Sequence, residues 1–115
     1  MKERREHPRF PARLPVKTTG PEGEFELVTG DVSLGGIKCH TSHHIPEMTR
    51  MALRIELPLE EGSEWITPKG VVVRIEPSEP VPGHSDYRVA LFFLELSDAD
   101  RAKLSRYLDR HHIMK

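Results

Sequence analysis

Short stretches in which apolar and polar residues alternate constrain the fold of this chain more than any other feature. In residues 51–57, methionine, leucine and isoleucine occupy every second position. This alternation places the apolar side chains on one face of a β-strand and the others on the opposite face. The same pattern recurs in five other segments: residues 12–17, 24–32, 37–40, 71–75 and 87–93. Six short strands separated by turn signals predict a small antiparallel barrel or sandwich.

Glycine and proline mark where the predicted strands end. They cluster at residues 19–23, 58–63 and 77–86, which we expect to form a turn and two loops. The apolar phase of the segment 24–32 shifts near Gly30, which indicates a β-bulge. Pro15 has no N–H, so we expect either that its strand lies at a sheet edge or that no donor is needed at this position.

The C-terminal segment has a different pattern, which predicts a helix over about residues 98–111. Ser97 is followed three residues later by Asp100, a capping-box pattern with aspartate in place of the usual glutamate. The apolar residues then recur at helical spacing: Leu104, Tyr107 and Leu108. The expected fold class is therefore mainly all-β, with one C-terminal helix lying against the strands.

Length and composition fit a single soluble domain. The chain has 115 residues, of which 37% are hydrophobic and 30% charged. No apolar run approaches the ~20 residues that cross a bilayer, and no apolar stretch follows the charged N-terminus. We therefore expect a cytoplasmic protein without membrane insertion. Cys39 is the single cysteine, which excludes an internal disulfide and a cysteine-built zinc cluster.

The charge is distributed unevenly along the chain. Residues 1–20 carry a net charge of +4, and the remaining residues carry −5. A basic segment on a mildly acidic body favours one localised anion site over a general nucleic-acid surface, which would be basic across a whole face. A solvated terminus is the alternative. We predict that residues 1–11 form a flexible basic arm and that residues 12–115 form the barrel and the helix.

The sequence offers no arrangement typical of an enzyme. Cys39 adjoins His40, but the strand alternation turns the cysteine inward, where a thiol is usually inert. The adjacent histidines at 43–44 and at 111–112 do not share a face, so neither pair is typical of a metal site. Residues 35–36 open a strand rather than a helix, unlike a phosphate-binding loop. We therefore expect no catalytic residue, no metal and no cofactor.

Two short motifs supply side chains that are suited to bind phosphate or the edge of a guanine base. Arg5 and Arg9 are four residues apart, and Asp31, Ser33 and Gly36 follow the pattern D-x-S-x-x-G. Arginine binds phosphate or the O6/N7 edge of guanine through two parallel hydrogen bonds, and aspartate accepts from the N1–H and N2–H groups of guanine. Residues 31 and 33 of a strand point to the same face, and glycine allows a close backbone approach. The same residue types also form turns that end a hairpin.

In their order, these motifs resemble those of the PilZ domain family. That family has an RxxxR motif before its first strand and a D/NxSxxG motif after that strand. The corresponding sequences here are RREHPRF at 4–10 and DVSLGGI at 31–37. The resemblance continues in the apolar strand 51–58, in GVVVR at 70–74, in YRVALFF at 87–93 and in the closing helix at 96–108. It covers nearly the whole chain.

The resemblance implies a bacterial receptor for cyclic di-GMP, built on a six-stranded antiparallel barrel of PilZ type with one C-terminal helix. By position in the motifs, Arg5 and Arg9 would hold phosphate and guanine edges. Asp31 and Ser33 would take a guanine edge, and Gly36 would shape the turn.

Two further positions follow from the same resemblance. Arg4 adds a second arginine directly before the first arginine of the motif. In this family such a doubled arginine often accompanies a ligand bound as a stacked pair of molecules, so Arg4 joins the predicted ligand residues. Ala90 stands where the family often has glycine, which affects the expected local packing rather than the choice of ligand.

The expected mechanism is a change in the basic arm. We expect the arm to be mobile without ligand, to order against the barrel when cyclic di-GMP binds, and so to change the surface offered to an unidentified effector protein. Two alternatives stay open: a PilZ-like interaction module that does not use the nucleotide site, and a small barrel that binds RNA or single-stranded DNA. The acidic body and the few exposed aromatic residues disfavour DNA and RNA.

Overall fold

The computed structural model describes residues 10–11, 14–20, 23–59 and 62–113. Most of the predicted arm, including Arg4, Arg5 and Arg9, lies outside these residues. The described chain forms eight strands and one helix: β1 (Phe10–Pro11), β2 (Pro15–Gly20), β3 (Gly23–Val32), β4 (Gly36–Thr41), β5 (Arg50–Leu59), β6 (Gly62–Ile66), β7 (Lys69–Glu76), β8 (Tyr87–Glu95) and α1 (Asp98–Ile113).

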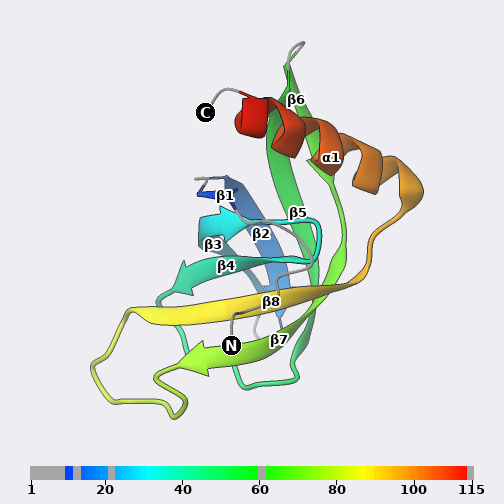
Figure 1. The fold of residues 1–115 in the computed structure, drawn as a ribbon. Coiled ribbons are helices and arrows are strands. Elements are labelled where there is room, and N and C mark those ends of the chain that lie inside the picture. Colours follow the sequence, from blue (N-terminus) through cyan, green and yellow to red (C-terminus); the bar gives the residue numbers. More distant parts are fainter. Residues whose placement is uncertain (1–9, 12–13, 21–22, 60–61, 114–115) are drawn as a thin grey trace, which may run out of the picture.

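Six of these strands close into an antiparallel barrel, and the helix lies across one end of it (Figure 1). The pairing order is β3-β2-β5-β7-β8-β4, and β4 pairs back onto β3 to complete the ring. Each of the two remaining strands pairs with a single strand of this ring, β1 with β3 and β6 with β5. The six-stranded barrel is therefore confirmed, and the sandwich is not formed.

Alternating side chains fill the barrel as the sequence predicts. In β5 the residues at 51, 53, 55 and 57 are buried, and those at 50, 52 and 54 are exposed. The other strands of the ring add their own inward residues, and α1 closes the core with its apolar stripe: Leu104, Tyr107 and Leu108. Burial of this apolar surface is the main force that stabilises a domain of this size.

The bulge predicted near Gly30 is also confirmed, whereas the sheet-edge position considered for Pro15 is wrong. The pairing of β3 with β4 shifts register between Thr29 and Asp31, which places a bulge at Gly30. Pro15 is the first residue of β2 and pairs with Val28 of β3, whereas the pairing of β2 with β5 begins one residue later. The missing N–H of Pro15 therefore breaks no ladder on the β5 side, although β2 is an inner strand.

The structure corrects the prediction for residues 58–63. Instead of a loop, β5 continues through Leu59, and β6 begins at Gly62 and pairs antiparallel with β5. The segment GSEWI has only two apolar residues at its end, so its sequence gives little periodic signal. Its strand depends on the pairing with β5, a contribution that local sequence does not report. The first predicted strand is also displaced, because β2 runs from Pro15 to Gly20.

The helix α1 is anchored at its first turn. The Ser97 hydroxyl accepts the backbone N–H of Asp100 at 3.1 Å, which confirms half of the predicted capping box. The Asp100 carboxylate accepts the backbone N–H of Thr67 at 2.8 Å and so ties the helix to the connection between β6 and β7. Within the described residues, no helix is long and apolar enough to cross a membrane.

Candidate functional site

An open groove of about 630 Å³ crosses four neighbouring strands on the outside of the barrel. These strands are β7, β8, β4 and β3, which lie side by side in the sheet. The groove is lined by the outward side chains of these strands together with parts of their backbone. It includes Asp31 of the D-x-S-x-x-G motif.

The strand registers arrange the groove residues in two rows. Asp31 pairs with Lys38, Lys38 with Ala90, and Ala90 with Arg74, so that one row runs across all four strands. The second row runs through His40 of β4, Arg88 of β8 and Glu76 of β7. His40 pairs with Arg88, and Arg88 pairs with Glu76. Because neighbouring strands are ~4.8 Å apart, residues 31 and 74 lie about three strand spacings apart along their row.

The groove includes two small residues, one at its β3 end and one on β8. Gly30 has no side chain, and the Ala90 methyl group lies between the long side chains of Lys38 and Arg74. Ala90 therefore fills little of the space between these two basic side chains.

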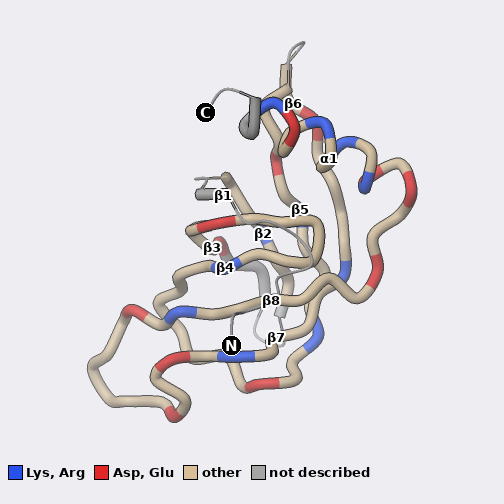
Figure 2. Tube along the Cα trace, in the orientation of Figure 1, with Lys and Arg blue, Asp and Glu red and all other residues tan. Residues whose placement is uncertain are grey.

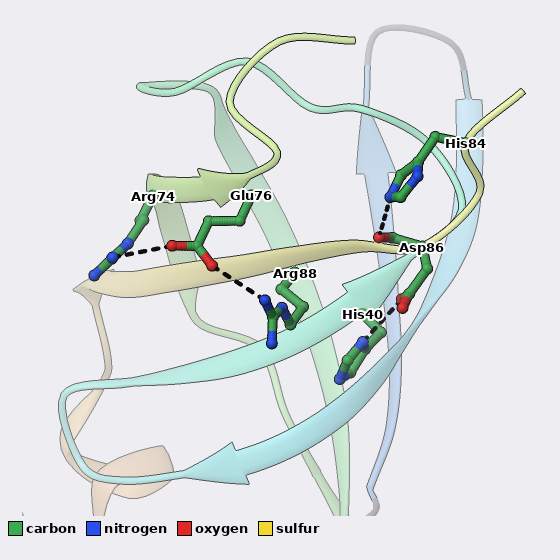
Figure 3. A network of polar contacts seen from close by, with 6 residues as sticks. All are labelled: His40, Arg74, Glu76, His84, Asp86 and Arg88. Atoms are coloured by element: carbon green, nitrogen blue, oxygen red, sulfur yellow. Dashed lines mark hydrogen bonds and ion pairs between the residues drawn. The ribbon is translucent and has the colours of Figure 1, made fainter. Parts of the chain in front are cut away.

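A single carboxylate links the two arginines of the groove (Figure 3). Glu76 accepts a hydrogen bond from Arg74 Nη2 at 3.0 Å through Oε2, and from Arg88 Nη2 at 3.4 Å through Oε1. These side chains are largely exposed, so each pair contributes only about 0–1 kcal/mol to stability. Figure 2 shows basic and acidic residues interleaved on this part of the sheet.

A second set of contacts borders the groove at the loop between β7 and β8. His40 Nδ1 lies 3.0 Å from a carboxylate oxygen of Asp86, and His84 Nε2 lies 2.8 Å from the backbone oxygen of Asp86 (Figure 3). The Tyr87 hydroxyl accepts the backbone N–H of Val81 at 2.9 Å. These contacts hold the loop beside the groove.

The thiol of Cys39, beneath this face, is unreactive near neutral pH. Cys39 is buried, as the strand alternation predicts. Burial, and secondarily the negative charge of Asp31, raise the pKa of its thiol to about 12. The thiol therefore stays protonated near neutral pH and does not supply a nucleophile.

Comparison with known protein families agrees with this arrangement. The model of the PilZ domain matches residues 3–110. The chain belongs to the PilZ domain family. No curated protein sequence matches it significantly.

Solved structures of PilZ proteins share this fold. MotI (DgrA), the inhibitor of motility of Bacillus subtilis, is 27% identical, with a TM-score of 0.83 over 99% of this chain and 54% of MotI. The PilZ domain of Escherichia coli YcgR with cyclic di-GMP is 21% identical, with a TM-score of 0.65 over 90% of this chain and 88% of that domain. The complex of K. pneumoniae MrkH with cyclic di-GMP is 21% identical, with a TM-score of 0.69 over 98% of this chain and 54% of MrkH. The chain spans about half the length of MotI and of MrkH.

The three residues of the PilZ D-x-S-x-x-G motif occupy different places. Asp31 lines the groove, but β3 ends at Val32, and Ser33 lies in the following turn with 3% of its surface exposed. The Ser33 hydroxyl accepts the backbone N–H groups of Gly35 at 3.1 Å and Gly36 at 3.3 Å. Ser33 therefore has a structural role in the turn, and its predicted contact with guanine stays a prediction.

Gly36 is required by the approach of two strands. A Cβ atom at this position would overlap the carbonyl oxygen of Leu91 on β8. The glycine of the PilZ motif thus allows β4 to lie against β8, which agrees with the predicted close backbone approach.

Sequence reasoning missed most of the groove. The groove residues of β4, β7 and β8 are brought together only by the register of these strands: Lys38, Arg74, Glu76 and Arg88. The outward phase of each residue was readable from the alternation, but its neighbours across the sheet were not. Within the described residues, no group of three or more histidine, cysteine or acidic side chains is placed to hold a metal.

A second hollow, of about 570 Å³, lies near the start of α1. Its lining includes Leu34, Phe92, Leu94 and Arg101. Phe92 is 52% exposed although it is large and apolar. In the alternation of β8, Phe92 is an outward residue between the buried Leu91 and Phe93.

Proposed function

We propose that this PilZ domain is a receptor for cyclic di-GMP that binds the nucleotide in the groove over β3, β4, β7 and β8. The ligand has two phosphates and two guanine bases. The groove offers three cationic side chains for phosphate (Lys38, Arg74 and Arg88) and the carboxylate of Asp31 for the donor edge of guanine. The ligand is bound and released without chemical change.

The observation that carries this proposal is the place of Asp31. The motif residue lies in the same groove as three cations from other strands, in a chain that belongs to the PilZ domain family. Solved structures of the PilZ proteins YcgR and MrkH contain cyclic di-GMP, which supports the same ligand class here.

The proposal includes the basic N-terminal arm. Arg4, Arg5 and Arg9 would close over the ligand from the side away from the barrel, and the ordered arm would change the surface that an effector protein meets. A ligand shifts such an equilibrium only by its greater affinity for the closed arm. The site of action would be the cytoplasm, where a second messenger is available to a soluble receptor.

Calorimetric titration of cyclic di-GMP tests the proposal. We would compare the wild type with an Arg5→Ala, Arg9→Ala double variant and with Asp31→Ala. We expect saturable binding by the wild type, loss of binding by the double variant and weaker binding by Asp31→Ala. Thermal unfolding of each variant controls for the fold, and the stoichiometry distinguishes one ligand from a stacked pair.

Blocking the groove provides a test that removes no polar contact. Ala90 and Leu94 both point outward from β8, but only Ala90 lies in the groove. Ala90→Trp should therefore abolish binding, whereas the matched control Leu94→Trp should bind as the wild type does. Equal binding by both variants would place the ligand elsewhere, and absence of binding by the wild type would refute the receptor function.

The second candidate is a protein-interaction module that does not use the nucleotide site. The exposed Phe92 and Leu94 beside α1 favour this alternative. It predicts no heat and no thermal shift with cyclic di-GMP, and it would make partner capture with Phe92→Ser as the control the next experiment.

A further inference from the structure

Besides Asp31, the groove contains a second acidic residue, which lies between two of the cations proposed to hold phosphate. Glu76 lies at the end of β7, opposite Arg88 of β8 and two residues after Arg74 on the same face. Its two carboxylate oxygens contact one guanidinium each, at 3.0 Å and 3.4 Å (Figure 3). Neither Glu76 nor Arg88 belongs to the RxxxR or D-x-S-x-x-G motif.

We propose that Glu76 is a built-in competitor that occupies the anion site of Arg74 and Arg88 until a phosphate of the ligand displaces it. This inference rests on the proposed binding of cyclic di-GMP in the groove. It assigns Glu76 the task of weakening that binding, so that the affinity is lower than the two arginines alone would give.

The geometry supports displacement because carboxylate and phosphate use the same donors. Arginine presents several N–H groups in a planar fork that matches either group. Two guanidinium groups held by one carboxylate are spaced to hold one compact anion. The position of the Glu76 carboxylate between Arg74 and Arg88 therefore marks where a phosphate oxygen would bind.

The exposure of the three side chains makes the exchange easy. Arg74 is 71% exposed, Arg88 is 68% exposed and Glu76 is 46% exposed. Ion pairs at such a surface are weak and are screened by salt. The bonds to Glu76 can therefore open without disturbing the barrel, and the freed carboxylate can turn toward solvent.

The charge of the groove changes accordingly. Its lining holds Lys38, Arg74, Arg88 and His40 together with two acidic residues, Asp31 and Glu76. Removing the charge of Glu76 leaves one acidic residue against the same lysine and two arginines. An anionic ligand would then meet a stronger positive potential and no internal rival for the arginines.

The Glu76→Gln variant separates this role from a positioning role. A competitor predicts that the variant binds cyclic di-GMP more tightly, by roughly three- to tenfold at low salt, as expected for one nearby charge at a solvated surface. It also predicts a steeper loss of affinity with added salt, because the arginines then exchange salt anions rather than Glu76 for the ligand. If Glu76 instead positions Arg88, the same variant binds less tightly.

A matched control removes the same charge outside the network. Glu79 is an exposed residue of the loop that follows β7. Glu79→Gln should leave the affinity and its salt dependence nearly unchanged. If Glu79→Gln tightens binding as much as Glu76→Gln does, net charge alone explains the effect and the inference is wrong.

Inorganic pyrophosphate provides a probe that does not depend on the nucleotide. Nuclear magnetic resonance signals of the Arg74 and Arg88 side chains should shift at a lower pyrophosphate concentration in Glu76→Gln than in the wild type. Absence of cyclic di-GMP binding by both proteins would refute the proposed function, and this titration would still decide the role of Glu76. Equal midpoints for the two proteins would overturn the inference even if both bind cyclic di-GMP.

Discussion

At the scale of single residues, the side chains of the groove and those of the turn at residues 33–36 have different roles. Asp31, Arg74 and Arg88 line the groove and are not part of the apolar core. Gly36 and Ser33 instead determine how β3 joins β4 and how closely β4 approaches β8. Substitutions in the first group should change binding, and those in the second group should change stability.

Gly36→Ala should therefore be strongly destabilising. The added methyl group would overlap the Leu91 carbonyl oxygen in the neighbouring strand, and backbone cannot move aside as a flexible side chain can. We expect a loss of about 3 kcal/mol in the free energy of unfolding, measured by denaturant titration. Gly30→Ala is the control, because a Cβ there would lie 3.5 Å from the Lys38 carbonyl oxygen, an ordinary contact. Equal losses in the two variants would contradict this explanation.

Cys39 should make the protein less stable at alkaline pH. The unfolded thiol has a pKa near 9.0, and in the folded barrel burial, followed by the charge of Asp31, raises this pKa to about 12. Below the lower value both states keep the proton, so the thiol does not affect the pH dependence. Between the two values only the unfolded chain ionises, and the free energy of unfolding falls by up to about 1.4 kcal/mol per pH unit.

The difference between the wild type and Cys39→Ala isolates this effect, since other groups titrate equally in both. Denaturant titrations at several pH values should show a steeper alkaline decline in the wild type. Parallel curves would mean that the folded thiol ionises as easily as the unfolded one.

At the scale of secondary-structure elements, α1 is held by one carboxylate as well as by its apolar stripe. Asp100 is buried at the first turn and accepts the Thr67 N–H. Asp100→Ala should cost about 1–3 kcal/mol, because it leaves that backbone donor without its partner. Amide exchange in α1 should also become faster. Asp98→Ala, which changes an exposed acidic residue of the same turn, should cost much less.

The strands and the helix differ in how strongly their own sequences predict them. β5 and β8 could be predicted because each alternates over a full strand and buries one face. The helix could be predicted because its cap and its apolar stripe agree. β6 could not be predicted, since its pairing with β5 depends on where the chain turns back rather than on its own residues.

At the scale of the whole molecule, the closed barrel should determine which strands unfold locally and which unfold only with the whole protein. Each ring strand is paired on both sides, whereas β6 pairs only with β5 among the described strands. We expect amides in β4 and β8 to exchange with solvent only through global unfolding, and those of β6 to exchange through local opening. Native-state hydrogen exchange at increasing denaturant checks this. If the β4 amides exchange through an opening that costs less free energy than global unfolding, the result would contradict a closed ring.

The candidate site is also formed at the scale of the whole molecule, so the sequence predicted only part of it. Asp31 could be predicted because its motif is local in the chain. The cations of the groove could not be predicted, because Lys38, Arg74 and Arg88 come to line one groove only when four strands adopt a common register. The predicted arm residues Arg4, Arg5 and Arg9 lie outside the described residues, and their role stays a prediction.

The different roles of the residues in the D-x-S-x-x-G motif give a rule for distinguishing related sequences that bind the ligand from those that only share the fold. Ser33 and Gly36 serve the turn and the β4–β8 contact, so a descendant that has lost its ligand would still need both to fold. Asp31 lines the groove in which we propose that the ligand binds, and it would be free to change in such a descendant. A serine and a glycine at these positions therefore indicate an intact barrel, and under the proposed function only the aspartate indicates ligand binding.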